Sequence, residues 1–459
     1  MGSVARLVAS SGLVLGLSVL VAVQPAFGAA RHAVSHTTNT TIWTPTLAPL
    51  PASLPDGRAP EFANLYSTSC SSTSFCVAVG EVQDSIGNVY PLIETGSGNT
   101  WAASIAPLPA NADSSSPTDI LNSVSCSTGG TCVAVGVYVS ANPSSQPGLL
   151  ETYSGGTWTA SEAPGSSSLT LTSVSCADSK MCMAVGTIDT PDAPVGDQVS
   201  AGIYTFDSGT WQQQAAPPLP SDYTFPPVPE GYSAGISVNS VSCPDESDCV
   251  VVGDYTTTAY YTDGGNSLLG LIDTYSSGNW SVEASPLPTN ANTTPADADL
   301  DAVDCISAEY CVAGGTYARS VSPGTGIPSP GSFVPLLEAF QSGVWSPSQG
   351  PLPPDAAPQP SAGIEGISCT AADECMADGI YTTSSSTSGL LLTQSGSGWS
   401  AVSAPVPVTP FVVRGSRASS TANGISLHGV SCMSTTFCRA VGKDGKRPLI
   451  ERMGKAPRR

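Results

Sequence analysis

The stretch SVSCSTGGTCVAVG, residues 123–136, decides the fold, because seven versions of it recur along the 459-residue chain. Each version is a variant of S-V-S-C-x5-C-x-A-V-G, and the glycine four places after the second cysteine occurs in every copy. Successive copies lie about 60 residues apart, a spacing close to the periods of propeller and solenoid repeats. The chain therefore repeats one structural unit seven times.

All fourteen cysteines belong to these repeats. The pairs are Cys70 and Cys76, Cys126 and Cys132, Cys176 and Cys182, Cys243 and Cys249, Cys305 and Cys311, Cys369 and Cys375, and Cys432 and Cys438. An even number of regularly spaced cysteines in an exported chain indicates disulfides. A zinc site would need two pairs or added histidines, and the chain has only three histidines. We predict seven local disulfides and no free thiol.

Residues 1–30 have the pattern of a secretory signal peptide, with Arg6 before an apolar run and small residues at 28–30. An uncleaved N-terminal anchor is the alternative. No later segment reaches the roughly 18 apolar residues that a membrane span needs. We expect a secreted protein, extracellular or at the cell surface, without a membrane span in the mature chain.

The charge is strongly acidic and uneven. Residues 32–438 carry 34 acidic and five basic side chains, whereas residues 439–459 carry two acidic and eight basic ones. A body with a net charge of −29 repels phosphate backbones, so nucleic acid is excluded as a partner. We expect residues 454–459 to form a basic C-terminal tail.

Each unit predicts four short antiparallel strands. In the second unit these are SVSC, CVAVGVY, GLLETYS and TWTASEAP, which are rich in Val and Thr and separated by glycine turns. Helical periodicity is absent. Four such strands make one blade of a β-propeller.

The two ends of the repeat region predict how the array closes. Trp43 has no cysteine pair before it, and the last pair is followed by RPLIERMGK without a tryptophan. The N-terminal strand can therefore complete the final blade and remove the exposed edges that an open solenoid would have to cap. We predict an all-β, seven-bladed propeller over 43–453, after a mobile segment at 31–42, and expect a monomer.

The turns SGGTW at 154–158 and FDSGTW at 206–211 resemble the Asp-box, S-x-D-x-G-x-T-W, of sialidase-like propellers. Kelch-type propellers are a looser match. Over nearly the whole mature chain the repeats resemble secreted bacterial repeat proteins with S-C-x5-C-x-A-V-G units. The resemblance implies an extracellular propeller.

A ligand site is expected where two long loops, 214–240 and 254–268, meet on the face opposite the cysteine turns. Aromatic and carboxylate side chains gathered there suit stacking and hydrogen bonding to a sugar or peptide. The alternative is that the tyrosines pack their own loops. The predicted ligand-binding residues are Tyr223, Phe225, Tyr232, Asp254, Tyr255, Tyr260, Tyr261 and Asp263.

Asp297, Asp299 and Asp301 are spaced like the opening of a calcium loop, although the glycine and final glutamate of an EF-hand are missing. The alternative is a solvated acidic turn. An acid also recurs seven residues before the tryptophan, at Glu94, Glu151, Asp273 and Glu338, and we interpret this repetition as structural. No catalytic residue is assigned, and calcium is the one candidate cofactor.

Histidine and arginine are too scarce for most acid–base and anion-binding constellations. The sequence therefore favours a non-enzymatic propeller that binds or scaffolds an extracellular ligand, such as a glycan, a peptide or an envelope component. The alternative is a glycoside hydrolase or lyase that uses carboxylate acid and base residues on polysaccharide.

Overall fold

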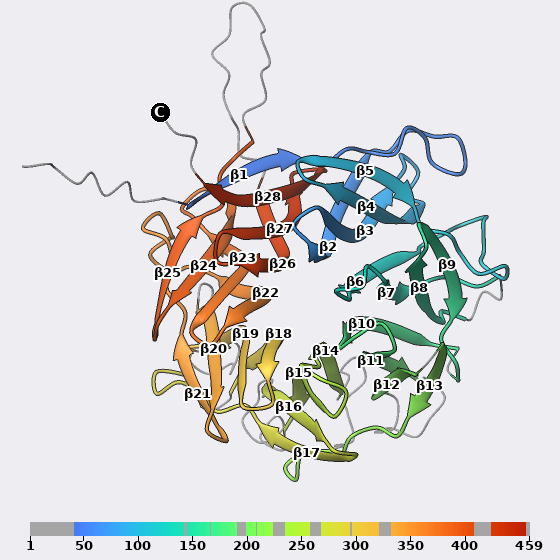
Figure 1. The fold of residues 1–459 in the computed structure, drawn as a ribbon. Coiled ribbons are helices and arrows are strands. Elements are labelled where there is room, and N and C mark those ends of the chain that lie inside the picture. The colour runs from blue at the N-terminus through green and yellow to red at the C-terminus, as the bar shows by residue number, and fades with distance from the viewer. Residues whose placement is uncertain are drawn as a thin grey trace, which may run out of the picture. The chain divides into compact units, whose positions relative to one another are not determined.

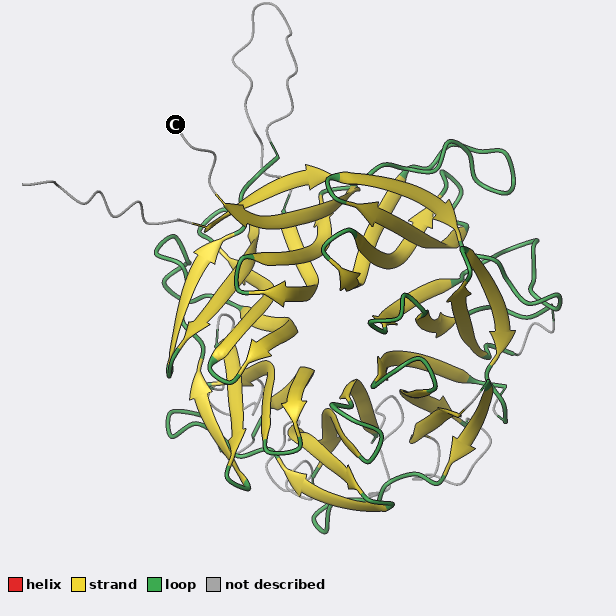
Figure 2. Ribbon diagram, viewed as in Figure 1, coloured by secondary structure: helices red, strands yellow, loops and turns green. Residues whose placement is uncertain are grey.

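The computed structural model describes ten ranges of the chain: residues 41–141, 145–165, 167–190, 199–207, 209–223, 235–257, 268–293, 296–320, 332–407 and 424–455. The compact unit begins at Thr40. The predicted signal peptide, and all but two residues of the predicted mobile segment, lie outside the described residues. Within the described ranges the regular structure is entirely β (Figure 2).

Seven four-stranded antiparallel sheets form the blades, arranged in a ring (Figure 1). Each blade has an inner strand at the centre of the ring, followed outward by a second, a third and an outer strand. The inner strands are β2 (Phe62–Ser72), β6 (Ile120–Cys126), β10 (Leu169–Cys176), β14 (Ile236–Ser242), β18 (Ala298–Ser307), β22 (Ala362–Ala371) and β26 (Ile425–Ser434). The blades are numbered in this order, which confirms the predicted seven-bladed propeller.

The other strands continue each blade outward. The second strands are β3 (Phe75–Gln83), β7 (Cys132–Val137), β11 (Met181–Asp189), β15 (Asp248–Thr256), β19 (Tyr310–Ala318), β23 (Glu374–Thr382) and β27 (Phe437–Asp444). The third strands are β4 (Val89–Ser97), β8 (Gly148–Ser154), β12 (Val199–Asp207), β16 (Leu268–Ser276), β20 (Phe333–Gln341), β24 (Thr387–Ser395) and β28 (Arg447–Lys455). The outer strands are β5 (Thr100–Ile105), β9 (Thr157–Glu162), β13 (Thr210–Gln214), β17 (Asn279–Ala284), β21 (Val344–Gln349), β25 (Gly398–Ser403) and, for blade 7, β1 (Thr41–Leu47).

The ring closes as the sequence predicts, by pairing the first strand with the last. β1 lies antiparallel to β28, with a register from Thr41 opposite Lys455 to Leu47 opposite Leu449. β28 therefore includes Gly454 and Lys455, which the sequence predicts to be part of the basic tail, because β1 offers partners to both. Closure leaves no blade without its fourth strand.

All seven predicted disulfides are present, and the described residues contain no free cysteine. Each joins the inner strand, or in blade 4 the residue that directly follows it, to the second strand of the same blade, with Cα atoms 4.0–4.1 Å apart. Closing so short a loop stabilises each blade by about 2 kcal/mol in the chain-entropy model.

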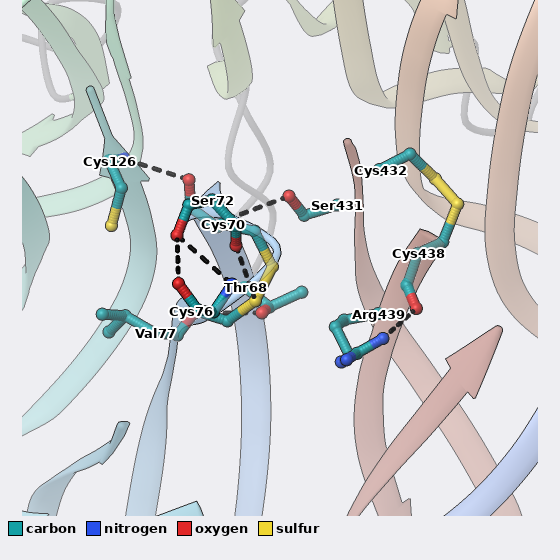
Figure 3. The surroundings of a disulfide bond; sticks show 12 residues. Thr68, Cys70, Ser72, Cys76, Val77, Cys126, Ser431, Cys432, Cys438 and Arg439 are labelled. Atoms are coloured by element: carbon teal, nitrogen blue, oxygen red, sulfur yellow. Dashed lines mark hydrogen bonds between the residues drawn. A yellow bond between two sulfur atoms is a disulfide. The ribbon is translucent and has the colours of Figure 1, made fainter. Parts of the chain in front are cut away.

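The residue before each first cysteine links neighbouring blades. Its side-chain oxygen accepts a hydrogen bond from the N–H of the first cysteine in the next blade, at 2.6–3.2 Å, and these bonds complete the circle. Figure 3 shows the bond that joins the last blade to the first, from Cys70 to Ser431. The serine of the S-C motif, which is Asp304 in blade 5, thus satisfies edge-strand donors that would otherwise face the centre unpaired.

Apolar clusters fill the space between adjacent blades. One cluster contains Val77 and Ile93 of blade 1 with Leu121 and Leu149 of blade 2, and Trp158 packs against it. The glycine of the motif is required by close strand approach, since a Cβ on Gly136 would lie 1.9 Å from the Ile120 carbonyl oxygen. The repeated motif thus encodes both blade geometry and blade packing.

Candidate functional site

Every inner strand contains a β-bulge four residues before its first cysteine, where the pairing with the second strand skips one residue. A bulge redirects the side chain of the extra residue. The seven extra residues, here called the bulge ring, all line one hollow at the centre of the propeller. They are Tyr66, Asn122, Thr172, Asn239, Asp301, Glu365 and His428.

The central hollow is polar and small. Its volume is about 170 Å³, which is enough for several water molecules. All seven inner strands contribute to its lining, so a group bound there can touch several blades at once. The hollow suits one sugar ring or one polar head group.

In blades 2 to 4 the bulge-ring side chains connect neighbouring blades. Asn122 Nδ2 donates to the Leu171 carbonyl oxygen at 2.8 Å, and Thr172 Oγ1 donates to that of Val238 at 2.6 Å. Asn239 Nδ2 repeats the bond across the next boundary, to the Leu300 carbonyl oxygen, at 3.1 Å. These three residues, the tied arc, are explained by the stability of the ring.

The serine that follows each residue of the tied arc adds a second connection. Ser123 accepts a hydrogen bond from the Val174 N–H, and Ser173 and Ser240 do the same for the next two blades, at 3.1–3.2 Å. Each of these blades is therefore tied to the following one at two adjacent positions.

Blades 5 to 7 depart from this arrangement at both positions. Their bulge-ring residues are Asp301, Glu365 and His428, here called the acidic arc, and among the described residues none of the three donates a hydrogen bond to a carbonyl oxygen of the next blade. The residues that follow are Ala302, Gly366 and Gly429, which have no hydroxyl. Both ties are thus replaced in three consecutive blades, which leaves a contiguous set of titratable groups facing the hollow.

Tyr66 of blade 1 lies next to the acidic arc. Its ring centroid is 5.7 Å from that of His428, and its hydroxyl donates to Glu81 Oε1 at 2.9 Å. His428 Nδ1 lies 3.9 Å from Glu365 Oε2, and within the described residues His428 Nε2 has no hydrogen-bond partner. An imidazole nitrogen, a phenol ring and carboxylates are therefore available together.

The electrostatics of the acidic arc favour bound protons or bound cations. Burial, followed by the charges of Asp299, Glu365 and Asp254, raises the pKa of Asp301 well above its usual value. Burial and the charge of Asp299 raise the pKa of Asp254 to about 7. Carboxyls held this close compete for protons because like charges destabilise one another at short range.

Five of the eight residues predicted to bind a ligand lie outside the described residues: Phe225, Tyr232, Tyr260, Tyr261 and Asp263. Tyr223 is partly buried, its ring 6.5 Å from that of Tyr255. Asp254 and Tyr255 lie in strand β15 rather than in a loop, and Tyr255 is fully buried. The structure thus brings Asp254 near the acidic arc and places Tyr255 inside the blade.

The burial of Tyr255 has a structural reason. Tyrosine also occurs six residues after the second cysteine in blades 2, 5 and 6, and each of these rings is fully buried. The Tyr255 hydroxyl donates to Asp222 Oδ1 at 3.0 Å, as the Tyr138 hydroxyl donates to Asn111 Oδ1. A tyrosine at this position therefore ties a proline-rich inter-blade segment to its blade.

Of the aspartates proposed for calcium, Asp297 lies just before strand β18, and Asp299 and Asp301 lie within it. Asp299 Oδ1 accepts a hydrogen bond from the Thr316 N–H at 2.9 Å, whereas Asp301 belongs to the bulge ring. Within the described ranges, no group of three or more His, Cys, Asp or Glu side chains could hold a metal ion. The calcium hypothesis thus finds no ligand set there.

The recurrent acids of the third strands are buried. Glu94, Glu151, Asp273 and Glu338, joined by Glu451 of blade 7, are 0–1% exposed. In four of the five blades the acid lies opposite the alanine of the C-x-A-V-G motif, which leaves room for the carboxyl. Burial raises the pKa of Glu94 and Glu151 to about 8. These positions cannot reach an external ligand.

Hydrophobic periodicity and motif spacing do not reveal the bulge ring, although the repeats carry a signal for it. When the seven repeats are aligned on their cysteines, the residue four places before the first cysteine differs in chemistry between most copies, within an otherwise regular motif. That position reads Tyr, Asn, Thr, Asn, Asp, Glu and His, and only the strand register shows that all seven meet.

Comparison with known proteins gives similarity in fold. The β-propeller domain of the Trilobed protease from Pyrococcus furiosus is 9% identical, with a TM-score of 0.44, over 86% of this chain and 98% of that chain. An Aleuria aurantia lectin variant in complex with alpha-methyl-L-fucoside is 13% identical (TM-score 0.42, 77% and 99%). An alpha-L-arabinofuranosidase of Fusarium graminearum, in complex with arabinobiose, is 12% identical (TM-score 0.42, 76% and 95%).

No family model matches the chain, and no curated protein matches it. The chain is an all-β propeller whose repeats are each joined by a disulfide, a pattern typical of proteins outside the cytosol. None of the described residues forms a helix long and apolar enough to cross a membrane.

Proposed function

We propose that this protein is a secreted binding propeller that holds one small polar ligand, or the polar end of a larger glycan or peptide, in its central hollow. The observation that supports this proposal is the replacement of both inter-blade ties in blades 5 to 7 by the acidic arc. Ala302, Gly366 and Gly429 give up hydrogen bonds that blades 2 to 4 retain. A stability loss confined to residues that face one hollow indicates a functional site.

The chemistry of the hollow suits hydrogen bonding to a ligand. Asp301 and Glu365 offer carboxyl oxygens, His428 offers a ring nitrogen and Tyr66 an aromatic face. Few precisely placed polar groups in a concave site are what fix ligand orientation. The outer-loop tyrosines Tyr232, Tyr260 and Tyr261 remain proposed as a second contact surface for a longer ligand.

The resemblance to secreted S-C-x5-C-x-A-V-G repeat proteins supports export, and we place the chain with that group. Asp-box and kelch-type propellers are the broader classes proposed for it. Seven disulfides are consistent with an oxidising compartment.

A glycoside hydrolase or lyase is the second candidate function. It is favoured by the presence of two carboxyls in the hollow, because burial and the like charges of neighbouring acids, Glu365 among them, raise the pKa of Asp301 well above its usual value. A protonated and an ionised carboxyl side by side can act as general acid and general base.

The test is a binding screen on the secreted protein, followed by an activity assay on each hit. Thermal shift and calorimetry with neutral, acidic and basic sugars, amino acids and glycan fragments should give ligands whose affinity falls in Asp301→Asn and Glu365→Gln. Glu151→Gln, at a buried carboxyl outside the hollow, is the matched control and should leave affinity unchanged. A ligand that binds all variants equally would move the site out of the hollow, and release of reducing sugar would select the hydrolase.

A further inference from the structure

Three further carboxyls lie close to the acidic arc, on three different strands. Asp254 comes from β15, Asp299 from β18 and Asp378 from β23. Burial and the charge of Glu365 raise the pKa of Asp378 well above its usual value. The carboxyls of blades 4 to 6 therefore form one interacting group around the hollow.

Asp378 is the most unusual member of this group, since the corresponding residues of the other second strands are Val or Gly. It is fully buried, and its carboxyl oxygen lies 2.4 Å from the place where a Cβ on Gly366 would stand. Gly366 and Gly429, which line the hollow, thus leave this carboxyl beside it. Neither oxygen has a hydrogen bond of normal geometry to the described residues, and the nearby Gly429 N–H only partly offsets the effect of burial.

No lysine or arginine balances these charges in the part of the chain that the structure describes. The four ion pairs found there are Arg58 with Asp56, Arg58 with Asp84, Lys446 with Glu61, and His428 with Glu365. Only the last involves the acidic arc, and its two atoms are 3.9 Å apart. Grouped carboxyls of this kind are stabilised when a cation joins them.

We infer that the ligand of the central hollow carries a protonated amine, whose ammonium group is held by Asp301 and Glu365. This inference rests on the proposed binding function and specifies the chemical class of the ligand. Ammonium N–H groups donate strong, charge-assisted bonds to carboxylates. The Tyr66 ring, which also lines the hollow, adds a face for a cation–π contact.

An amine fits the site better than a metal ion does. The described residues contain no group of three or more His, Cys, Asp or Glu side chains placed for a metal, whereas an ammonium group needs only two or three acceptors. A net charge of −29 over residues 32–438 also steers cations toward the protein and repels anions. The volume of about 170 Å³ accepts an amino sugar ring or the end of an aliphatic amine.

The experiment compares amines with neutral counterparts of the same shape. Glucosamine with glucose, and cadaverine with pentanediol, are titrated calorimetrically into the full secreted protein at pH 6, where the amines are charged. We expect the amine of each pair to bind at least tenfold more tightly than its counterpart. Asp301→Asn and Glu365→Gln should each weaken amine binding at least tenfold. Glu151→Gln, the same carboxyl-to-amide change at a buried position outside the hollow, should not, and melting curves report whether each variant folds.

The outcomes separate this inference from the proposed function. Equal affinity for both members of each pair, with loss in the Asp301 and Glu365 variants, overturns the amine and retains the hollow as the site. Amine binding that survives both variants overturns the site itself. If neither amine binds while neutral compounds from the wider screen do, the amine is again overturned; if nothing binds at all, both proposals fail.

Discussion

Blades 2 to 4 and blades 5 to 7 have the same backbone, the same disulfides and the same bulge, yet they differ in what the bulge does. In blades 2 to 4 it ties neighbours together through Asn122, Thr172 and Asn239. In blades 5 to 7 it presents two carboxyls and an imidazole to the hollow. Because the copies share one chain and one fold, the first set serves as an internal control for the second.

The difference between the two sets of blades indicates which positions of a repeat protein are candidates for function. A residue that recurs around the ring, such as the buried tyrosine of blades 2, 4, 5 and 6, serves the blade. A position that loses its structural role in some blades only, and does so in a contiguous set facing one hollow, is a candidate for function. The inter-blade hydrogen bonds that blades 5 to 7 lack, relative to blades 2 to 4, show how far these blades depart from the structural pattern.

The largest expected effect is a dependence of stability on pH. It is caused by the buried acids of the third strands, which lie outside the acidic arc. The folded pKa of Glu94 is raised from 4.5 to about 8. A raised folded pKa gives stability that is complete below the unfolded pKa and is lost as the pH rises through the folded pKa. Each such carboxyl therefore costs up to about 1.4 kcal/mol per pH unit between these values. Thermal unfolding from pH 4 to pH 8 should show maximal stability at the acid end.

The matched variant for this prediction is Glu94→Gln with Glu151→Gln, far from the acidic arc. It should flatten the pH profile and stabilise the protein at pH 7 by a few kcal/mol, on the order of what two such carboxyls cost there. Ligand affinity should not change. A profile as steep as that of the unaltered protein would show that these carboxyls keep their ordinary pKa values.

The second prediction converts one arc into the other. Asp301→Asn with Ala302→Ser gives blade 5 the two residues that blade 4 has at the same positions, Asn239 and Ser240. We expect stability to rise by about 1–3 kcal/mol, because two hydrogen bonds form and a buried carboxyl is removed. Binding in the hollow should fall at least tenfold. Chemical denaturation measures the stability and calorimetry the ligand affinity of the same preparation. A double variant that is less stable than the unaltered protein would contradict the claim that blade 5 gives up stability at these two positions.

The smallest effect comes from removing a single tie. Thr172→Val deletes the hydrogen bond to the Val238 carbonyl and keeps the side-chain shape. It should destabilise the protein by about 0.5–1.5 kcal/mol. His428→Asn, in the acidic arc, should cost less or be neutral, since His428 Nε2 has no partner among the described residues to lose. Equal losses in both variants would show that the arcs do not differ in structural role.

Much of the fold could be predicted because the sequence encodes it locally. The C-x5-C spacing determines each hairpin, the valine and threonine strands follow it, and the unpaired Trp43 indicates how the ring closes. The seven disulfides needed no tertiary information, since each joins residues only six positions apart.

The site could not be predicted in the same way, because it depends on how distant strands converge. Asp301 and Glu365 are brought together by the circular arrangement, and their direction is determined by bulges that sequence periodicity does not show. The polar and aromatic sequence DYTTTAYY predicts that Tyr255 lies in a loop, but strand β15 continues through Tyr255 to Thr256. Tyr255 lies six residues after the second cysteine of its repeat, as Tyr138 does, so the repeat alignment indicates that the two tyrosines are equivalent.

The closure of the ring has a mechanical consequence. Thr41 and Lys455, the outermost residues of β1 and β28, are paired with each other, so both chain ends leave the propeller at the same end of this strand pair. Force applied between the two ends would load the hydrogen bonds one after another, starting from that pair, rather than all together. No disulfide crosses between blades to resist it. A propeller tethered at both ends would open at low tension, whereas one tethered at a single end would not experience this load.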